Sequence, residues 1–164
     1  MTDSPLLVVL GGLPGTGKTT LARALAQELA ASHIRIDTIE QALLRSSALE
    51  RAGIAGYAVG MAVAADSLRV GRPVVADAVN AVDAARDGWR GLDARTVEVW
   101  LTCTDAGEHR RRVESREADI PGHRQPTWAE VIAVDVDPWP QAATVETAGR
   151  SPAAVLADVL ALCR

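Results

Sequence analysis

Residues 12–19 read Gly-Leu-Pro-Gly-Thr-Gly-Lys-Thr and match the phosphate-binding pattern GxxxxGK(S/T) in full. Glycines in such a loop let backbone N–H groups surround a phosphate, and the helix that follows adds the positive end of its dipole. Lys18 is the single lysine beside 16 arginines, which indicates a position where a compact ammonium cannot be exchanged for a guanidinium. It can reach the terminal phosphates of a nucleotide, and the Thr19 hydroxyl can ligate Mg²⁺. The residues predicted to bind the nucleotide here are Gly12, Leu13, Pro14, Gly15, Thr16, Gly17, Lys18, Thr19 and Thr20.

Asp77 directly follows the apolar run 74–76. A hydrophobic strand that ends in Asp is typical of the carboxylate that holds Mg²⁺ beside a nucleotide, so we predict that Thr19 and Asp77 bind the metal. The alternative is an Asx turn at the end of a strand. No Glu follows Asp77 and no second lysine exists for an NKxD motif, which disfavours a motor ATPase and a GTPase.

Asp37 ends a predicted strand, 34–37, and ligands of parallel α/β sheets bind at the carboxyl ends of strands. We predict that Asp37 contacts the substrate and accepts the proton of its hydroxyl group, while Lys18 and Mg²⁺ stabilise the transferring phosphoryl group. Asp37 and Glu40 also fit a capping box, with Asp37 at the N-cap and Glu40 at the third helical position. The sequence leaves both interpretations open.

The segment 108–116 predicts a basic helix with Arg112 and Arg116 four residues apart on one face, and Arg124 lies beyond it. Arginines on a closing segment stabilise the charge of a transferring phosphoryl group, so we predict that Arg112 and Arg116 are catalytic and that Arg112 also binds the nucleotide. Arg124 is a predicted substrate contact. The alternative is a solvated helix whose arginines pair with Glu108 and Glu114.

Asn80 and Arg86 follow the predicted third strand and are further candidates for substrate binding; the alternative is a turn and an exposed helix. The histidines His33, His109 and His123 are isolated in the sequence and receive no predicted role.

These residues depend on elements that alternate along the chain. Apolar runs predict strands at 6–10, 34–37, 73–77, 96–101 and 144–146. Helical spacing predicts helices at 19–31, 38–46, 57–70, 84–92, 108–116, 127–134 and 151–162. The alternation predicts an α/β fold of the P-loop NTPase type, a three-layer sandwich around a five-stranded parallel sheet. We expect one domain, 1–164, with a short Arg-rich lid near 105–126 that contains the irregular segment 120–126.

The 164 residues are 48% hydrophobic and 23% charged, with a formal net charge of −4. These values predict a soluble globular protein and argue against a general nucleic-acid-binding protein, which needs surplus Lys and Arg. The N-terminal residues 1–5 lack a basic n-region and no apolar run is long enough for a membrane span, so we expect a cytoplasmic protein without membrane contact. Monomer and homodimer both remain open.

The P-loop, Asp37, the run Asp77-Ala78-Val79-Asn80 with Arg86, and the pair Arg112 and Arg116 resemble P-loop small-molecule kinases in order and spacing. This group includes gluconate kinase, adenylylsulfate kinase, chloramphenicol phosphotransferase, zeta toxin and polynucleotide 5′-kinase domains. Segments 109–116, 119–122, 126–131 and 137–139 resemble more closely the bacterial AAA family ATPase-type kinases of this size.

The resemblance implies ATP and Mg²⁺ as cofactors, a mobile lid, and a sheet in which the Asp77 strand lies next to the P-loop strand. The Asp-x-x-Arg of polynucleotide kinases reads Asp37-Thr38-Ile39-Glu40 here, which argues against a nucleic-acid substrate. We therefore expect a kinase that transfers the γ-phosphoryl group of ATP·Mg to a hydroxyl group of a small molecule. The alternative is a nucleotide-dependent regulatory module with slow ATP hydrolysis.

Overall fold

The computed structural model describes residues 4–47 and 49–164. Of the N-terminal residues 1–5, in which we expect no signal peptide, residues 1–3 lie outside the described residues. A five-stranded parallel sheet with the order β2-β3-β1-β4-β5 forms its centre. The strands are β1 (Leu6–Gly12), β2 (Ser32–Arg35), β3 (Val74–Asp77), β4 (Arg95–Thr102) and β5 (Ala143–Glu146). The expected parallel sheet is confirmed, and β3, which ends in Asp77, lies beside the P-loop strand β1 as the resemblance implied.

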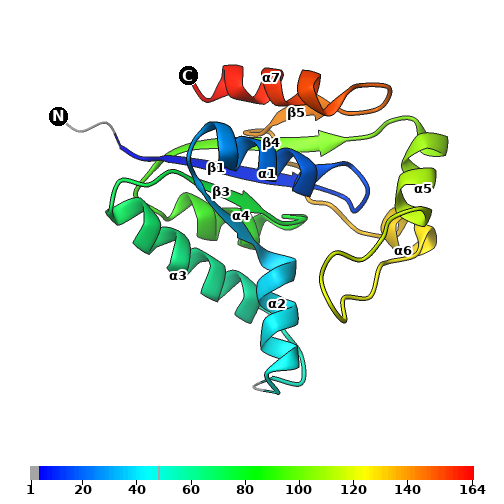
Figure 1. Ribbon diagram of the computed structural model, residues 1–164, viewed down its shortest axis with the longest axis horizontal. Coiled ribbons are helices and arrows are strands. Elements are labelled where there is room, and N and C mark those ends of the chain that lie inside the picture. The colour runs from blue at the N-terminus through cyan, green and yellow to red at the C-terminus, as the bar shows by residue number, and fades with distance from the viewer. Residues whose placement is uncertain (1–3, 48) are drawn as a thin grey trace.

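Helices cover both faces of this sheet (Figure 1). They are α1 (Lys18–Glu28), α2 (Ile36–Arg45), α3 (Ala55–Arg69), α4 (Asp83–Arg90), α5 (Ala106–Glu114), α6 (Trp128–Ile132) and α7 (Pro152–Leu162). Successive side chains of a strand point to opposite faces. Leu6, Val8 and Leu10 of β1 accordingly pack with α1 and α7, and Leu7 and Val9 pack with residues of α3 and α4. The result is the predicted three-layer sandwich.

The second strand lies two residues earlier in the chain than predicted, at 32–35 instead of 34–37. It ends at Arg35, opposite Asp77, because Asp77 is the last residue of the neighbouring strand β3 and the ladder has no partner beyond it. Helix α2 therefore begins at Ile36, and Arg35, which contributes no capping hydrogen bond from its side chain, is the N-cap. The predicted capping box of Asp37 and Glu40 is wrong, because Asp37 already lies inside the first helical turn.

A capping box occurs instead at α6, where Thr127 and Glu130 exchange the two hydrogen bonds between side chain and backbone. Ser151 caps α7 ahead of Pro152, as its sequence predicts. Among the described residues, no helix combines the length and apolar character needed to cross a membrane.

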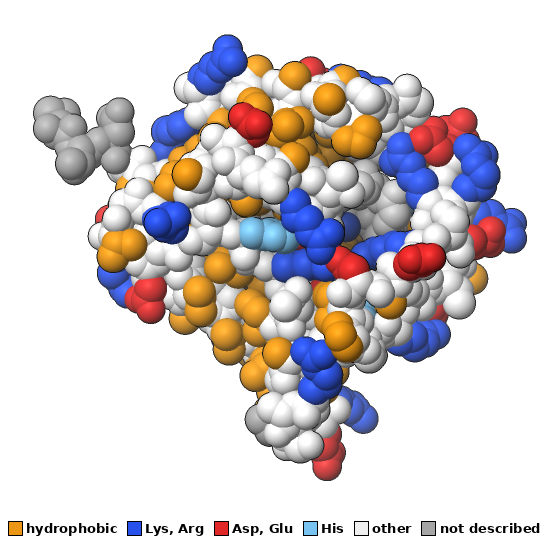
Figure 2. All heavy atoms as spheres, viewed as in Figure 1, with side chains coloured by type: hydrophobic (Ala, Val, Ile, Leu, Met, Phe, Trp, Pro, Cys, Tyr) orange, Lys and Arg blue, Asp and Glu red, His pale blue; other side chains and the backbone are white. Residues whose placement is uncertain are grey.

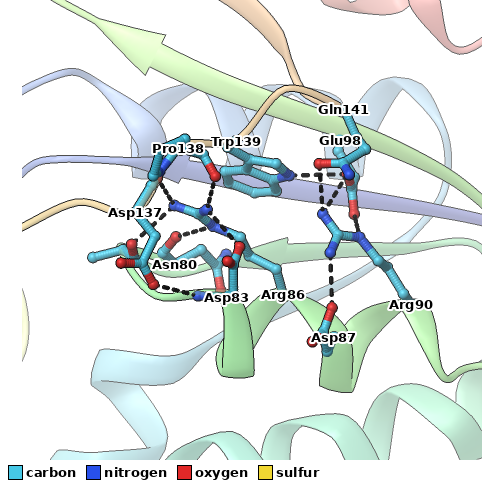
Figure 3. A network of polar contacts seen from close by, with 11 residues as sticks. Asn80, Asp83, Arg86, Asp87, Arg90, Glu98, Asp137, Pro138, Trp139 and Gln141 are labelled. Atoms are coloured by element: carbon cyan, nitrogen blue, oxygen red, sulfur yellow. Dashed lines mark hydrogen bonds and ion pairs between the residues drawn. The ribbon is translucent and has the colours of Figure 1, made fainter.

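Arg86 of α4 is fully buried and its guanidinium lies 4.5 Å from the centre of the Trp139 ring (Figure 3). Its N–H groups donate to four backbone carbonyl oxygens, those of Asn80, Ala81, Asp137 and Pro138. A guanidinium has five donors and no acceptor, so it can satisfy carbonyl groups of two chain segments that form no regular ladder. Arg86 thus joins the segment after β3 to the segment before β5.

Asn80 is equally enclosed. Its backbone is left-handed, with φ of 51°, a conformation that Asn tolerates better than most residues. Its side chain donates to the carbonyl oxygen of Leu10 at 2.7 Å and accepts from the indole N–H of Trp89 at 3.1 Å. Asn80 and Arg86 were expected to bind substrate, and this expectation is corrected, because both side chains are fully buried and their polar atoms bond to other groups of the protein.

Replacing Arg86 by methionine keeps an apolar stem in the same space. It removes the donor of the Asn80, Asp137 and Pro138 carbonyl groups, and the Ala81 carbonyl keeps only the backbone N–H of Asp137. We expect Arg86→Met to lower the free energy of unfolding by about 3 kcal/mol, the scale of a broken buried charged network. Urea unfolding measures this change. Arg69→Met is the matched control, because Arg69 is exposed on α3 and pairs only with Asp66; its effect is expected to stay within about 0.5 kcal/mol. A loss below about 1 kcal/mol in Arg86→Met would contradict the structural role.

Candidate active site

The phosphate-binding loop lies between β1 and α1, at the carboxyl end of the sheet. Gly15 has φ of 85°, and a Cβ atom there would lie 2.7 Å from a methyl group of Val113 in α5. Glycine is therefore required both by the backbone and by the close approach of α5. The Thr16 hydroxyl donates to the carbonyl oxygen of Leu13 at 2.8 Å and closes the loop from inside.

Lys18 begins α1 and folds back under the loop, where its ammonium group donates to the carbonyl oxygen of Leu13 at 3.1 Å. The residue is only 9% exposed. Burial lowers the pKa of Lys18 to about 8, although the negative charges of Asp77 and Asp37 act in the opposite direction. The loop thus holds a cation that has lost most of its hydration.

Asp77, at the end of β3, lies beside this cation and is 3% exposed. Burial alone would raise its pKa, but the hydrogen bond with His33, the Lys18 ammonium and the Thr19 hydroxyl together lower the pKa below its usual value. The His33 Nε2 atom is 3.1 Å from a carboxylate oxygen of Asp77. An ionised carboxylate next to a threonine hydroxyl is a set of hard oxygen donors that fits Mg²⁺.

Asp37 lies in the first turn of α2, and its side chain is 38% exposed. The His123 Nε2 atom is 4.0 Å from its carboxylate. Asp37 is close enough to Lys18 to contribute to the pKa of that lysine, so the predicted base and the predicted phosphate ligand lie in one site. The negative charge of Asp37, together with burial, also raises the pKa of Glu40 one turn further along α2.

Helix α5 rests on the phosphate-binding loop through His109, whose Nε2 atom is 2.8 Å from the carbonyl oxygen of Pro14. Arg112, on the same helix, donates to the Thr147 hydroxyl and carbonyl groups at 3.0 and 2.9 Å and also pairs with Glu108. Arg116 lies just beyond the helix, lines the cleft described below, and forms no hydrogen bond or ion pair with the described part of the chain.

Arg124 does not join them in this structure. Its exposed side chain pairs with Glu130 of α6 at 2.7 Å. The predicted pairing of basic residues with Glu108 and Glu114 is found for Arg112 and Arg110, respectively.

A cleft of about 460 Å³ runs from the phosphate-binding loop to the start of α7, a volume typical of small-ligand sites. One end is lined by loop residues and arginines, and the other by apolar residues of α7. The lining residues are Gly15, Thr16, Gly17, Lys18, Thr19, Thr20, Leu21, Ala24, Arg112, Arg116, Thr147, Arg150, Pro152, Ala153, Val155 and Leu156.

Three residues without a predicted role belong to this site: His33, His109 and Arg35. Arg35 is 6% exposed, and its Nε atom is 3.9 Å from the Asp77 carboxylate. Figure 2 shows basic side chains, an acidic one and a histidine gathered near the start of α2. The only sequence signal for His33 and Arg35 is their place on the strand that ends near Asp37, because their contact with Asp77 depends on the pairing of β2 with β3.

Known structures with the same architecture include those of P-loop kinases. A candidate kinase from Chloroflexus aurantiacus has a TM-score of 0.76 at 22% identity, over 98% of this chain and 97% of that one. A gluconokinase from Sinorhizobium meliloti has a TM-score of 0.65 at 19% identity, over 98% and 93% of the two chains. The APS kinase CysC of Mycobacterium tuberculosis, solved with AMPPNP and APS, has a TM-score of 0.69 at 18% identity, over 99% of each chain. A search of curated proteins finds no match.

These likenesses define the class: an α/β protein with the fold of P-loop kinases. The sequence also matches the family model described as AAA domain over residues 7–133, which include β1 to α6. The chain therefore belongs to this AAA domain family.

The lowered pKa of Lys18 predicts a pH-dependent stability of the ligand-free protein. The unfolded state binds this proton up to pH 10.5, but the folded state loses it near pH 8, so the destabilisation by the buried charge is complete below pH 8 and fades as the pH rises toward 10.5. We expect Lys18→Met to increase the free energy of unfolding by on the order of 3 kcal/mol at pH 7 and by much less at pH 10. Urea unfolding at the two pH values, with Arg69→Met as the control, measures the gap. An equal gap at both would refute the explanation.

Glu146, at the end of β5, directly precedes Thr147, which lines the cleft. Its carboxylate accepts hydrogen bonds from the backbone N–H groups of Thr104, Thr147 and Ala148. Burial acts to raise its pKa, but these hydrogen bonds outweigh it and lower the pKa to about 2. Its stabilisation is therefore complete above pH 4.5 and disappears as the pH falls toward 2.

We expect Glu146→Gln to lower the free energy of unfolding at pH 7 by about 1–2 kcal/mol. Urea unfolding between pH 3 and pH 7 tests this, and the difference from the wild type is expected to shrink as the pH falls. Glu114→Gln is the control, because Glu114 makes one exposed ion pair with Arg110. A pH-independent difference for Glu146→Gln would show that the charge of Glu146 is not the cause.

Proposed function

We propose that this protein is a kinase that transfers the γ-phosphoryl group of ATP·Mg to a hydroxyl group of a small molecule. The observation that carries the proposal is the convergence of Lys18, Asp77 and Asp37 at one edge of the sheet, with Lys18 electrostatically coupled to both carboxylates. A phosphate ligand, a metal ligand and an available base are the groups that phosphoryl transfer requires.

We place ATP in the cleft because one end of the cleft is polar and basic and the other end is apolar. The loop from Gly12 to Thr20 would surround the phosphates, with Lys18 on the terminal ones, and the apolar wall near Leu156 would contact the base. Thr19 and Asp77 would hold Mg²⁺, which bridges phosphate oxygens and neutralises their charge. Residues 1–164 would act as one domain.

Asp37 would act on the acceptor. Its carboxylate takes the proton of the acceptor hydroxyl, the hydroxyl oxygen forms a bond to the γ-phosphorus, and the bond from that phosphorus to the β–γ bridging oxygen breaks, which releases ADP. The absence of the capping box supports this role, because α2 does not use the Asp37 side chain to cap its N-terminus.

The segment 105–126 would act as the lid. Arg112 and Arg116 already line the cleft, and a guanidinium on either side of the transferring group would stabilise its charge. Arg124 would have to leave Glu130 before it could contact a substrate. The gluconokinase and APS kinase with the same fold act on small molecules, which supports a small-molecule acceptor here.

The decisive measurement is ADP release from ATP·Mg, alone and with pools of sugars, sugar acids, nucleosides, aminoglycosides, phenicols and short oligonucleotides. We expect one pool to stimulate turnover. Lys18→Ala is expected to lose about 100-fold or more in turnover, because the phosphates lose their main cation. Asp37→Asn is expected to retain ATP affinity within about twofold and to lose acceptor-stimulated turnover by on the order of 10²-fold or more.

Asp66→Asn is the control for the second substitution, because Asp66 is an exposed acid on α3 outside the site. Unchanged turnover in Lys18→Ala would refute phosphate binding by the loop. Tight ATP binding with a slow rate that no pool stimulates would favour a nucleotide-dependent regulatory module.

A further inference from the structure

The buried polar side-chain atoms that lack a hydrogen-bond partner within the described part of the chain lie in only three residues. They are the Nε atom of Arg35, the Nδ1 atom of His123, and both amide atoms of Gln125. Such atoms are rare in folded proteins, because each buried group without a partner is costly. Two of the three residues belong to the irregular segment 119–125, and Arg35 is bound to the start of the same segment.

That contact joins Asp119 to two arginines. Arg35 donates to both carboxylate oxygens of Asp119, at 2.7 and 3.1 Å, and Arg23 of α1 donates to one of them at 2.6 Å. The two-pronged geometry is the one with which a guanidinium binds a carboxylate or a phosphate. One carboxylate of this trio thus faces two guanidinium groups, and Arg35 also lies 3.9 Å from the Asp77 carboxylate.

The trio borders the proposed base. Arg35 precedes Asp37 by two residues, and His123, from the segment that begins at Asp119, is 4.0 Å from the Asp37 carboxylate. On its other side, the unpartnered Nε atom of Arg35 faces Asp77 at 3.9 Å. Arg35 thus lies between the proposed metal ligand and the segment that covers Asp37.

We propose that the phosphoryl acceptor is a hydroxylated small molecule with a carboxylate or phosphate group, and that this group replaces Asp119 on Arg35 and Arg23. The inference rests on the proposed kinase function and names its acceptor class. Asp119 occupies the anion site in the ligand-free protein, and an acceptor anion in its place brings the hydroxyl group to Asp37. The unpartnered atoms of His123 and Gln125 are then available to the other polar groups of the acceptor.

The replacement is selective by charge. A neutral polyol cannot compete with Asp119 for two guanidinium groups. Without these guanidinium groups, the nearby acids Asp37 and Glu40 would repel an anionic acceptor. Transfer itself is unchanged: the acceptor hydroxyl oxygen gains the phosphoryl group, Asp37 takes the proton, and ADP leaves.

The anion site can be tested without turnover. The melting temperature of the protein saturated with ADP·Mg is measured with and without inorganic phosphate, in wild type, Asp119→Asn and the double variant Asp119→Asn/Arg35→Met. Removing the internal competitor is expected to strengthen phosphate binding roughly 10- to 100-fold, so phosphate should stabilise Asp119→Asn more than wild type. The double variant should lose that gain.

Phosphate bound at the nucleotide site contributes equally to all three proteins and cancels in the comparison. Arg23→Ala in the Asp119→Asn background is a second test, because Arg23 is more than half exposed and its removal should not impair folding. An equal phosphate effect in wild type and Asp119→Asn overturns the proposal, as does a gain that persists without Arg35.

The acceptor class is tested by ADP release with matched compounds: glycerol, glycerate and glycerol 3-phosphate, and glucose, gluconate and glucose 6-phosphate. Stimulation by an anionic member, with KM raised roughly 10- to 100-fold in Arg23→Ala and unchanged in Arg69→Ala, supports the proposal. Stimulation by the neutral members alone leaves the kinase function in place and overturns the anionic acceptor. If no compound in this or the wider pools stimulates turnover, the kinase function fails, and the phosphate measurement still decides the anion site.

Discussion

The cation of Lys18 lies inside the protein, and its charge is tolerated there because the carboxylates of Asp77 and Asp37 lie nearby. Most of the fold serves this juxtaposition. Strand β3 must pair with β1 so that Asp77 lies next to the loop. Strand β2 must pair with β3 so that His33 contacts Asp77 and the first turn of α2 brings Asp37 to the same edge of the sheet. A parallel sheet achieves this because the carboxyl ends of its strands share one edge.

The end of the P-loop strand is held by the chain that follows β3. The Gly12 N–H donates to the carbonyl oxygen of Val79, and the Asn80 side chain donates to that of Leu10, so the chain after β3 clamps the end of β1. Arg86 then satisfies the carbonyl groups that this irregular path leaves open. The buried guanidinium of Arg86 thereby stabilises the segment that holds the end of β1. A lysine at this position would offer three N–H donors for four carbonyl oxygens.

The sequence predicts the elements well, because they depend on local patterns of apolar runs and helical spacing. The phosphate-binding motif can likewise be read from the sequence, because its residues are contiguous. The sequence fails for groups whose environment is set by strand pairing. Arg86 and Asn80 follow Asp77 closely and resemble ligands in sequence, yet the path of residues 137–139 encloses Arg86, and Leu10 and Trp89 take up the Asn80 side chain. Likewise His33, Arg35 and Asp119 are unremarkable in sequence, since their contacts join residues 44 and 84 positions apart.

If the site binds polyanions as proposed, its cations need other partners in the absence of a ligand, and three acids supply them. Asp77 balances Lys18, Glu108 pairs with Arg112, and Asp119 pairs with Arg35. Glu108 and Asp119 would compete with a phosphate or carboxylate of a ligand for Arg112 and Arg35, so ligand binding at these arginines should loosen the segment that carries the acid. Arg116 has no such partner among residues 4–47 and 49–164, so it can bind an anion that enters the cleft without first breaking an ion pair there. Arg112 and Arg116 line the cleft, and Asp119 begins the segment over Asp37. A nucleotide bound in the cleft would therefore act on the lid three residues before the acid that the proposed acceptor replaces. Residues 117 and 118 therefore link, along the chain, an arginine of the cleft to the acid that holds Arg35.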